Sequence, residues 1–188
     1  MKKTLSVVLA LVLCFGASLA LADTFGLGIV TSIDASTPGY IEDGEAYNGR
    51  AQVDSTICAV ILDDKGVIVD IYFDVAQTRV DFTPEGEILS DLEAIQKTKM
   101  EKRDGYNMRG RSPIGAELFE QVNALRAFCI GKTAEEVLGM KLTTEGDHAG
   151  ASADADLATS CTITINEYLA ALAKAVANAA AGEILEIQ

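Results

Sequence analysis

The sequence predicts an α+β fold in which a small antiparallel sheet is covered by helices. Residues 51–82 are rich in β-branched and aromatic side chains and contain the turn Asp63-Asp-Lys-Gly66, with glycine in its last position. Residues 113–130 and 167–179 carry apolar side chains at helical spacing. A sheet and helices of this kind bury their apolar faces against each other. We expect the sheet to consist of the hairpin and a further strand at 162–165, where Thr-Ile-Thr-Ile alternates with a period of two.

The first residues have the pattern of a secretory signal peptide. Lys2 and Lys3 precede an apolar run at 5–15, and Ala20-Leu-Ala22 offers small residues for cleavage. The apolar run is too short for a comfortable membrane span. We therefore expect cleavage after Ala22, a secreted or extracytoplasmic protein, and a single domain over residues 23–188.

The mature chain is strongly acidic. Removal of Lys2 and Lys3 leaves 13 basic against 28 acidic residues, a formal charge of −15. This charge argues against binding of nucleic acid or of an anionic membrane surface. Membrane association is expected only if Cys14 is lipidated, and Leu13 stands where a lipoprotein signal needs a small residue.

The chemistry available to an enzyme is limited. The mature chain holds Cys58, Cys129 and Cys161, which allow either one disulfide and a free thiol or three buried thiols. His148 is the one histidine and no Cys-x-x-Cys occurs, so a zinc, haem or histidine-based catalytic site is not expected. No serine has a positioned histidine, and the many carboxylates follow from composition alone. The sequence therefore predicts no catalytic residue and no metal site.

The N-terminal half is expected to be mainly strand. Phe25-Gly-Leu-Gly28 lacks a following helix and a Lys-Ser/Thr pair, so it indicates the start of an apolar strand rather than a phosphate loop. Residues 52–62 and 67–75 are the two strands of the hairpin, and residues 77–82 either continue the second strand or pair again. Residues 89–96 have the composition of a short helix.

The C-terminal half is expected to be helical. Ser112 and Pro113 open the helix over 113–130, which ends at Gly131. Thr133 and Glu136 stand at capping-box spacing at the start of a second, short helix that closes at Gly139. Residues 143–155 are a polar loop, and Asn166 is a candidate N-cap of the last helix.

Residues 97–111 differ from the rest of the chain in charge. They hold six of the 13 basic residues of the mature chain, opposed within the stretch by Glu101 and Asp104. One interpretation is a solvated face or a set of ion pairs with the acidic remainder. The other is an anion site, in which Lys99 and Arg109 bind phosphate and Tyr106 or Met108 contacts a ring.

The stretch Asp156-Leu-Ala-Thr-Ser-Cys-Thr162 leads directly to the last predicted helix. A hydroxyl-rich turn before a helix N-terminus favours binding of a phosphate, and a strand followed by a cap is the alternative. The stretch resembles the Asp-x-x-Ser/Thr-Gly-Ala-Thr motif of FMN-binding domains. These occur in flavoprotein subunits of sodium-pumping NADH:quinone reductases and in secreted electron-transfer proteins. Asp156, Thr159 and Thr162 match the motif, whereas Ser160 and Cys161 replace its glycine and alanine.

The hairpin turn also resembles the Lys-Asp-Gly-Lys-Ile-type turn of this family, and the resemblance covers about residues 45–82 and 154–180. It implies an FMN-binding, electron-transfer-type protein rather than a stand-alone enzyme. The flavin phosphate would lie near Thr162, esterified to it by a flavin transferase, with Thr159 and Ser160 presenting hydroxyl and N–H groups. Asp156 would position the turn or a metal used by the transferase, and Cys161 would be a small buried side chain.

A redox partner protein is implied as well. The alternative, which the replacements Ser160 and Cys161 favour, is a secreted non-catalytic binding or interaction domain that shares the fold but lacks the flavin.

Overall fold

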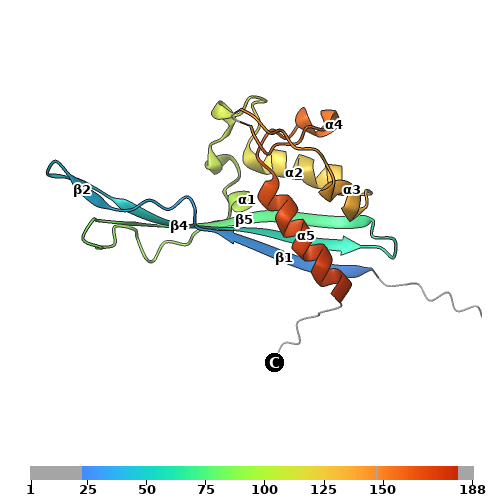
Figure 1. Cartoon of the computed structure of the whole chain (residues 1–188), viewed down its shortest axis with the longest axis horizontal. Helices are drawn as coiled ribbons and strands as arrows, with labels where there is room; N and C mark the ends of the chain where they lie inside the picture. The colour runs from blue at the N-terminus through green and yellow to red at the C-terminus, as the bar shows by residue number, and fades with distance from the viewer. Residues whose placement is uncertain (1–22, 147, 182–188) are drawn as a thin grey trace, which may run out of the picture.

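The chain folds as an antiparallel sheet with a layer of helices, in a computed structural model that describes residues 23–146 and 148–181 (Figure 1). The sheet consists of β1 (Thr24–Ser32), β4 (Gly49–Leu62) and β5 (Ile68–Phe82) in the order β1-β4-β5. A separate small hairpin is formed by β2 (Tyr40–Glu42) and β3 (Glu45–Tyr47). The predicted α+β class, with a small antiparallel sheet and several helices, is therefore confirmed.

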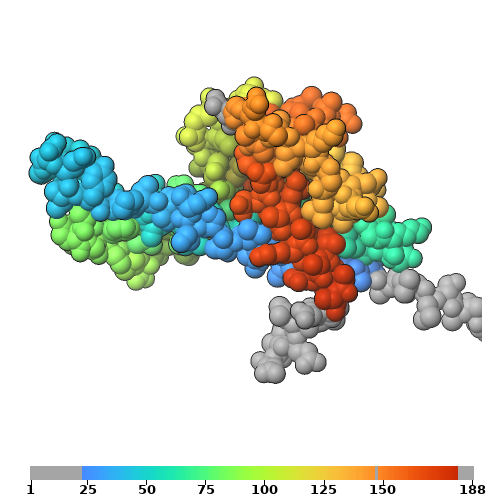
Figure 2. Space-filling view, viewed as in Figure 1, coloured from blue at the N-terminus to red at the C-terminus, as the bar shows by residue number. Residues whose placement is uncertain are grey.

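The β4–β5 hairpin is longer than the two strands predicted over 52–62 and 67–75. In the turn between β4 and β5, the N–H of Gly66 donates to the carbonyl of Asp63 over 3.1 Å, and Gly66 has a φ of +75°. Strand β5 runs without interruption through residues 77–82, and Gly49 pairs with Phe82. Because β4 and β5 are so long, their far ends project beyond the helical layer as a distal arm (Figures 1 and 2).

The helices lie against one face of the sheet. Helix α5 (Asn166–Ala181) packs across β1 and β4, while α2 (Leu118–Cys129) packs on β5. The short helices α1 (Lys99–Lys102), α3 (Ala134–Leu138) and α4 (Ala155–Ala158) complete this layer. The largest fully buried side chains between the layers include Phe73, Leu125, Ile165 and Leu172.

Two glycines of β1 allow α5 to approach the sheet closely. A Cβ atom at Gly26 would lie 1.9 Å from the carbonyl oxygen of Ala175, and one at Gly28 would lie 2.0 Å from that of Ala171. Both positions therefore require glycine. The Phe25-Gly-Leu-Gly28 stretch is a strand, as predicted, and its glycines serve helix packing rather than phosphate binding.

Two predicted elements are wrong. Residues 162–165 are not a strand, and β1 provides the third strand of the sheet. The N–H of Thr162 donates to the Gln121 side chain and that of Ile165 to the carbonyl of Gly150, so these backbone groups have partners outside any sheet. Residues 89–96 form no helix, because the chain there turns back along β5: the N–H of Leu89 donates to the carbonyl of Asp81.

Helix boundaries differ more subtly. Helix α2 begins at Leu118 rather than at 113, because Glu117 and Glu120 form the capping box that starts it. Asn166 is the first residue of α5 and not its N-cap. Helix α3 has the predicted capping box of Thr133 and Glu136 and ends at Gly139.

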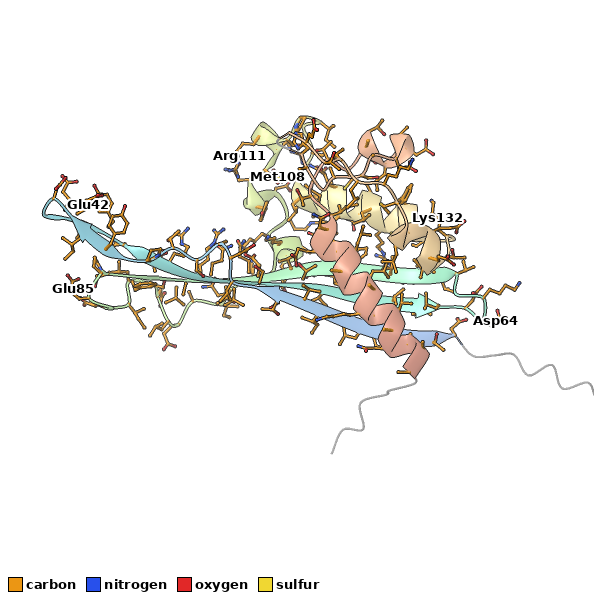
Figure 3. All side chains as sticks on the ribbon, in the orientation of Figure 1. Glu42, Asp64, Glu85, Met108, Arg111 and Lys132 are labelled. Atoms are coloured by element: carbon orange, nitrogen blue, oxygen red, sulfur yellow. The ribbon has the colours of Figure 1, made fainter. Side chains whose placement is uncertain are left out.

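The distal arm has little helical cover. The β2–β3 hairpin lies on one side of it and residues 83–97 on the other, where Glu42 and Glu85 mark the two tips in Figure 3. Several large apolar side chains are exposed there: Tyr40, Ile41, Tyr47, Ile88, Leu89, Leu92 and Ile95.

Candidate functional site

The N-terminal part of α2 brings the two predicted segments together. Glu117 and Gln121 lie four residues apart and so project from the same side of the helix. The carboxylate of Glu117 accepts the backbone N–H groups of Met108 and Arg109, each over 2.9 Å. The amide oxygen of Gln121 accepts the N–H of Thr162 over 2.8 Å and its hydroxyl over 3.2 Å. Residues 97–111 and the Thr162 motif are thus held by neighbouring turns of one helix.

Gln121 is fully buried, and both halves of its amide have partners. Its Nε2 donates to the hydroxyl of Ser112 over 3.1 Å and to the carbonyl of Ala116 over 3.2 Å. These donors and acceptors fix the orientation of the amide. A buried amide with every partner in place holds three segments of the chain in a single arrangement.

The basic stretch is folded into α1 and two 3-10 turns, η1 (Arg103–Tyr106) and η2 (Arg109–Arg111). Two of its cations form ion pairs within the chain. Lys99 lies 3.4 Å from the carboxylate of Asp54, and Arg109 lies 3.0 Å from that of Glu120 and 3.3 Å from that of Asp104. This arrangement agrees with the ion-pair interpretation of the stretch.

The ring-contact candidates also face inward. Tyr106 and Met108 are half-buried and pack against the core cluster. Arg103 lies with its guanidinium carbon 4.0 Å from the centre of the Phe119 ring. Figure 3 places Met108 and Arg111 at the end of the helical layer, where the guanidinium of Arg111 donates to the carbonyl of Asn107 over 3.4 Å.

The Glu117 carboxylate is itself an anion bound by the basic stretch. The N–H of Met108 is the main cause that lowers the pKa of Glu117, and the N–H and the charge of Arg109 lower it further. The side chain is buried. Residues 108 and 109 therefore use their backbone donors on an internal carboxylate.

The residues before Thr162 form a short helix and a turn. Asp156 is exposed in α4. The hydroxyl of Thr159 donates to the carbonyl of Asp156 over 3.3 Å, and that of Ser160 to the carbonyl of Leu157 over 3.2 Å. Cys161 is fully buried, as predicted.

All three described cysteines are free and buried. Burial raises the pKa of Cys58 and Cys129 to about 12 and that of Cys161 to about 11. Thiols with such pKa values hold almost no thiolate at neutral pH and are therefore unreactive. Of the two alternatives, three buried thiols is the one found.

Two open cavities lie away from the Thr162 motif. One, of about 430 Å³, is lined by residues that include Phe128, Lys132 and Met140. The other, of about 410 Å³, lies on the distal arm beside Thr37, Arg50 and Gln52. Neither is lined by a residue of 97–111 or 156–162. Within the ranges 23–146 and 148–181, no group of three or more His, Cys, Asp or Glu is placed to hold a metal ion.

An FMN phosphate ester at Thr162 would remove one of these contacts. Esterification removes the hydroxyl proton and leaves two acceptor oxygens, those of Thr162 and Gln121, facing each other where the hydrogen bond of 3.2 Å now runs. If the amide turned over, its NH₂ group would face the Thr162 N–H and would leave Ser112 and Ala116 without their donor. In the present orientation the Gln121 oxygen therefore loses the hydroxyl and keeps the N–H of Thr162, whereas turning the amide over leaves polar groups unpaired beside a fully buried side chain.

Glu117 and Gln121, which hold the two predicted segments together, were missed by sequence reasoning. Both are polar, and both lie on the buried side of α2 with Leu118, Val122 and Leu125. Gln121 could have been found from the sequence, because it interrupts the apolar stripe of a helix and a buried polar side chain needs specific partners.

The face of the sheet opposite the helices is open and mainly apolar. It is formed by alternate residues, 25–31 on β1, 51–61 on β4 and 70–80 on β5. Phe25 is 64% exposed, Ile29 46% and Tyr72 44%. Asp70 and Asp74 are the two charged residues among these positions.

Both carboxylates of this face turn towards the β5 edge. Asp70 accepts the N–H of Ile71 over 2.8 Å and pairs with Arg126 of α2 over 2.7 Å. Asp74 accepts the N–H of Val75 over 2.7 Å and that of Met100 over 3.1 Å. The middle of the open face therefore carries no charge.

Four hydrogen-bonding groups along the two sheet edges are also engaged by side chains. On β1, Asn178 donates to the carbonyl of Leu27 over 2.7 Å and Lys174 to that of Ile29 over 3.0 Å. On β5, the Asp70 and Asp74 carboxylates take the N–H groups of the following residues. Side chains placed in this way block addition of a further strand.

Comparison with known proteins gives one partial likeness. A chlorophenol reductase of Desulfitobacterium hafniense is 32% identical to this chain over 93 residues, which is 44% of this chain and 28% of the reductase. The chain thus spans less than a third of the length of that relative. No family model matches the sequence, and no solved structure matches it. Among the described residues, no helix combines the length and the apolar character that a bilayer crossing requires.

Proposed function

We propose that the chain is an extracytoplasmic, non-catalytic interaction domain, with the open face of its sheet as the working surface. The observation that carries the proposal is the mainly apolar open face, which has no charge in its middle and side chains bonded to backbone groups at both sheet edges. An apolar surface of this extent is typical of a protein contact.

The contacts around Thr162 support this function over flavin binding. The groups that a flavin phosphate would need are engaged elsewhere: the Thr162 hydroxyl with Gln121, Lys99 with Asp54, and Arg109 with two carboxylates. To bind these groups, a phosphate would have to displace a hydrogen bond or an ion pair that is already present in the folded chain.

The test is a search for flavin in the purified protein. The mature chain is produced by secretion together with a flavin transferase, and its absorption spectrum and the mass of its Thr162 peptide are measured. We expect a colourless protein, an unmodified peptide and no quenching of free FMN fluorescence on titration. A Thr162 peptide heavier by FMN less water, with the increase abolished in Thr162→Val, would overturn the proposal.

A flavin-carrying electron-transfer protein is the second candidate. It is favoured by the proximity of residues 97–111 to the Thr162 motif at α2 and by the partial likeness to a protein named as a reductase. Under this alternative, FMN binds without an ester and a redox partner protein exchanges electrons with it. Joint substitution of Lys99 and Arg109 by alanine would then weaken FMN binding at least tenfold, while Lys65→Ala on the exposed β4–β5 turn would leave it unchanged.

A further inference from the structure

Strand β4 has the sequence of a strand that is covered on both sides. Residues 57–62, Ile-Cys-Ala-Val-Ile-Leu, are a continuous apolar run rather than an alternation of apolar and polar side chains. Such runs belong to strands buried on both faces, whereas a sheet with one wet face alternates. The helices cover Cys58, Val60 and Leu62. The side chains of Ile57 and Ile61 on the other face remain partly exposed.

We propose that the open face is covered by a second copy of this chain, so that the two sheets pack face to face in a symmetric dimer. This inference rests on the proposed function and names its partner. A two-fold axis places the same patch against itself, so the patch must tolerate its own charge. With Asp70 and Asp74 drawn to the β5 edge, the middle of the face meets this condition.

Charge also explains why the contact uses this face. Two mature chains of charge −15 repel each other, and the repulsion is smallest where the contacting surface carries no charge. A cationic partner would gain nothing from a face without carboxylates in its middle. Strand addition at β1 is blocked by Lys174 and Asn178, which leaves stacking of the sheets as the available mode.

The dimensions suit a sheet-on-sheet contact. At about 3.3 Å per residue, the open face extends for roughly 35 Å along β4, and stacked sheets lie about 10 Å apart. Phe25, Leu27 and Ile29 on β1 would interdigitate with their counterparts, as side chains do between the sheets of a sandwich.

The test is the oligomeric state of the mature chain 23–188, measured by sedimentation equilibrium over a range of protein concentrations. We expect a reversible monomer–dimer equilibrium for the wild type. Ile29→Glu places a carboxylate of each copy in the apolar contact and should weaken dimerisation at least a hundredfold. The matched control is Ile95→Glu on the distal arm, where the isoleucine is 92% exposed, and it should dimerise as the wild type does.

Circular dichroism and thermal unfolding establish that both variants fold. A wild type that is monomeric at every concentration would overturn the dimer, and so would dimerisation lost in Ile95→Glu but kept in Ile29→Glu. Salt gives a second readout: an apolar contact between acidic chains should tighten or stay constant as salt screens their repulsion. Weakening by salt would contradict it. A colourless, monomeric protein would leave the interaction domain with a different partner, whereas bound flavin would overturn the proposed function itself.

Discussion

The two faces of the sheet are built from alternate residues of the same three strands, yet they differ in what covers them. On the helix face, Cys58, Val60, Ile71 and Phe73 are almost completely buried beneath α2 and α5. On the open face, Phe25 and Tyr72 keep 64% and 44% of their surface exposed. Folding accounts for the apolar side chains of the first face. The apolar side chains of the second contribute little to folding, so we attribute them to association.

The largest expected effect compares one phenylalanine from each face. Phe73→Ala removes a ring that is 1% exposed and should lower the free energy of unfolding by about 3–5 kcal/mol. Phe25→Ala should cost less than about 1 kcal/mol for the monomer, because most of that ring is in contact with solvent. Urea unfolding at a concentration below dimerisation measures both. Equal losses would mean that the two faces do not differ in their role in folding.

Glycine provides the next comparison. Gly28→Ala forces a methyl group against the carbonyl oxygen of Ala171 and should destabilise the protein by about 1–3 kcal/mol or more. Gly105→Ala is the control, because no heavy atom lies within 4 Å of an added Cβ there. Thermal unfolding of the two variants gives the difference. A Gly28→Ala variant as stable as the wild type would show that α5 does not pack on β1 as closely as described.

The buried Gln121 amide should contribute less to the free energy of unfolding than the ring of Phe73. Gln121→Ala leaves the N–H of Thr162 and the carbonyl of Ala116 without their partner, at a cost of about 1–3 kcal/mol. Asn123→Ala, on the exposed side of the same helix, is the matched control. Hydrogen exchange at Thr162 should accelerate in Gln121→Ala alone. Unchanged exchange in that variant would remove Gln121 as the residue that holds the motif.

The smallest effect is a dependence of stability on pH through Glu117. The N–H of Met108 lowers the pKa of this carboxylate in the folded state. Its stabilising contribution is therefore complete above the pKa of an unfolded glutamate, about 4.3, and is lost as the pH falls through the lower folded value. Glu117→Gln should reduce the melting temperature at pH 7 and match the wild type in strong acid. Glu85→Gln, at an exposed turn, is the control; a constant difference between Glu117→Gln and the wild type across pH would contradict the assignment.

The elements specified by local pattern were predictable from the sequence. The β4–β5 turn, the capping box of Thr133 and Glu136, and the helix after Thr162 depend on residues close in the chain, and each forms. The prediction of a strand at 162–165 was wrong, because period-two alternation over four residues cannot reveal a hydrogen-bond acceptor that is distant in the sequence. Gln121, which takes the Thr162 N–H, lies 41 residues away in the sequence.

The candidate site was harder to predict for the same reason. The sequence identified residues 97–111 as unusual but not that Asp54 and Glu120 neutralise Lys99 and Arg109, since these partners are set by tertiary packing. It also identified the apolar run of β4 but not which face would stay open. Sequence periodicity describes the strand, while the number and placement of the helices decide which side they cover.

Protection of the open face is the measurement that tests the account most directly. Hydroxyl-radical footprinting of residues 23–188 with the wild-type sequence, read by mass spectrometry at low and high protein concentration, follows Phe25 and Tyr72 on the open face and Leu92 and Ile95 on the distal arm. We predict that oxidation of Phe25 and Tyr72 falls as the concentration rises while that of Leu92 and Ile95 stays constant. Constant oxidation at Phe25 and Tyr72, or protection confined to the arm, would contradict the open face as the working surface of this protein.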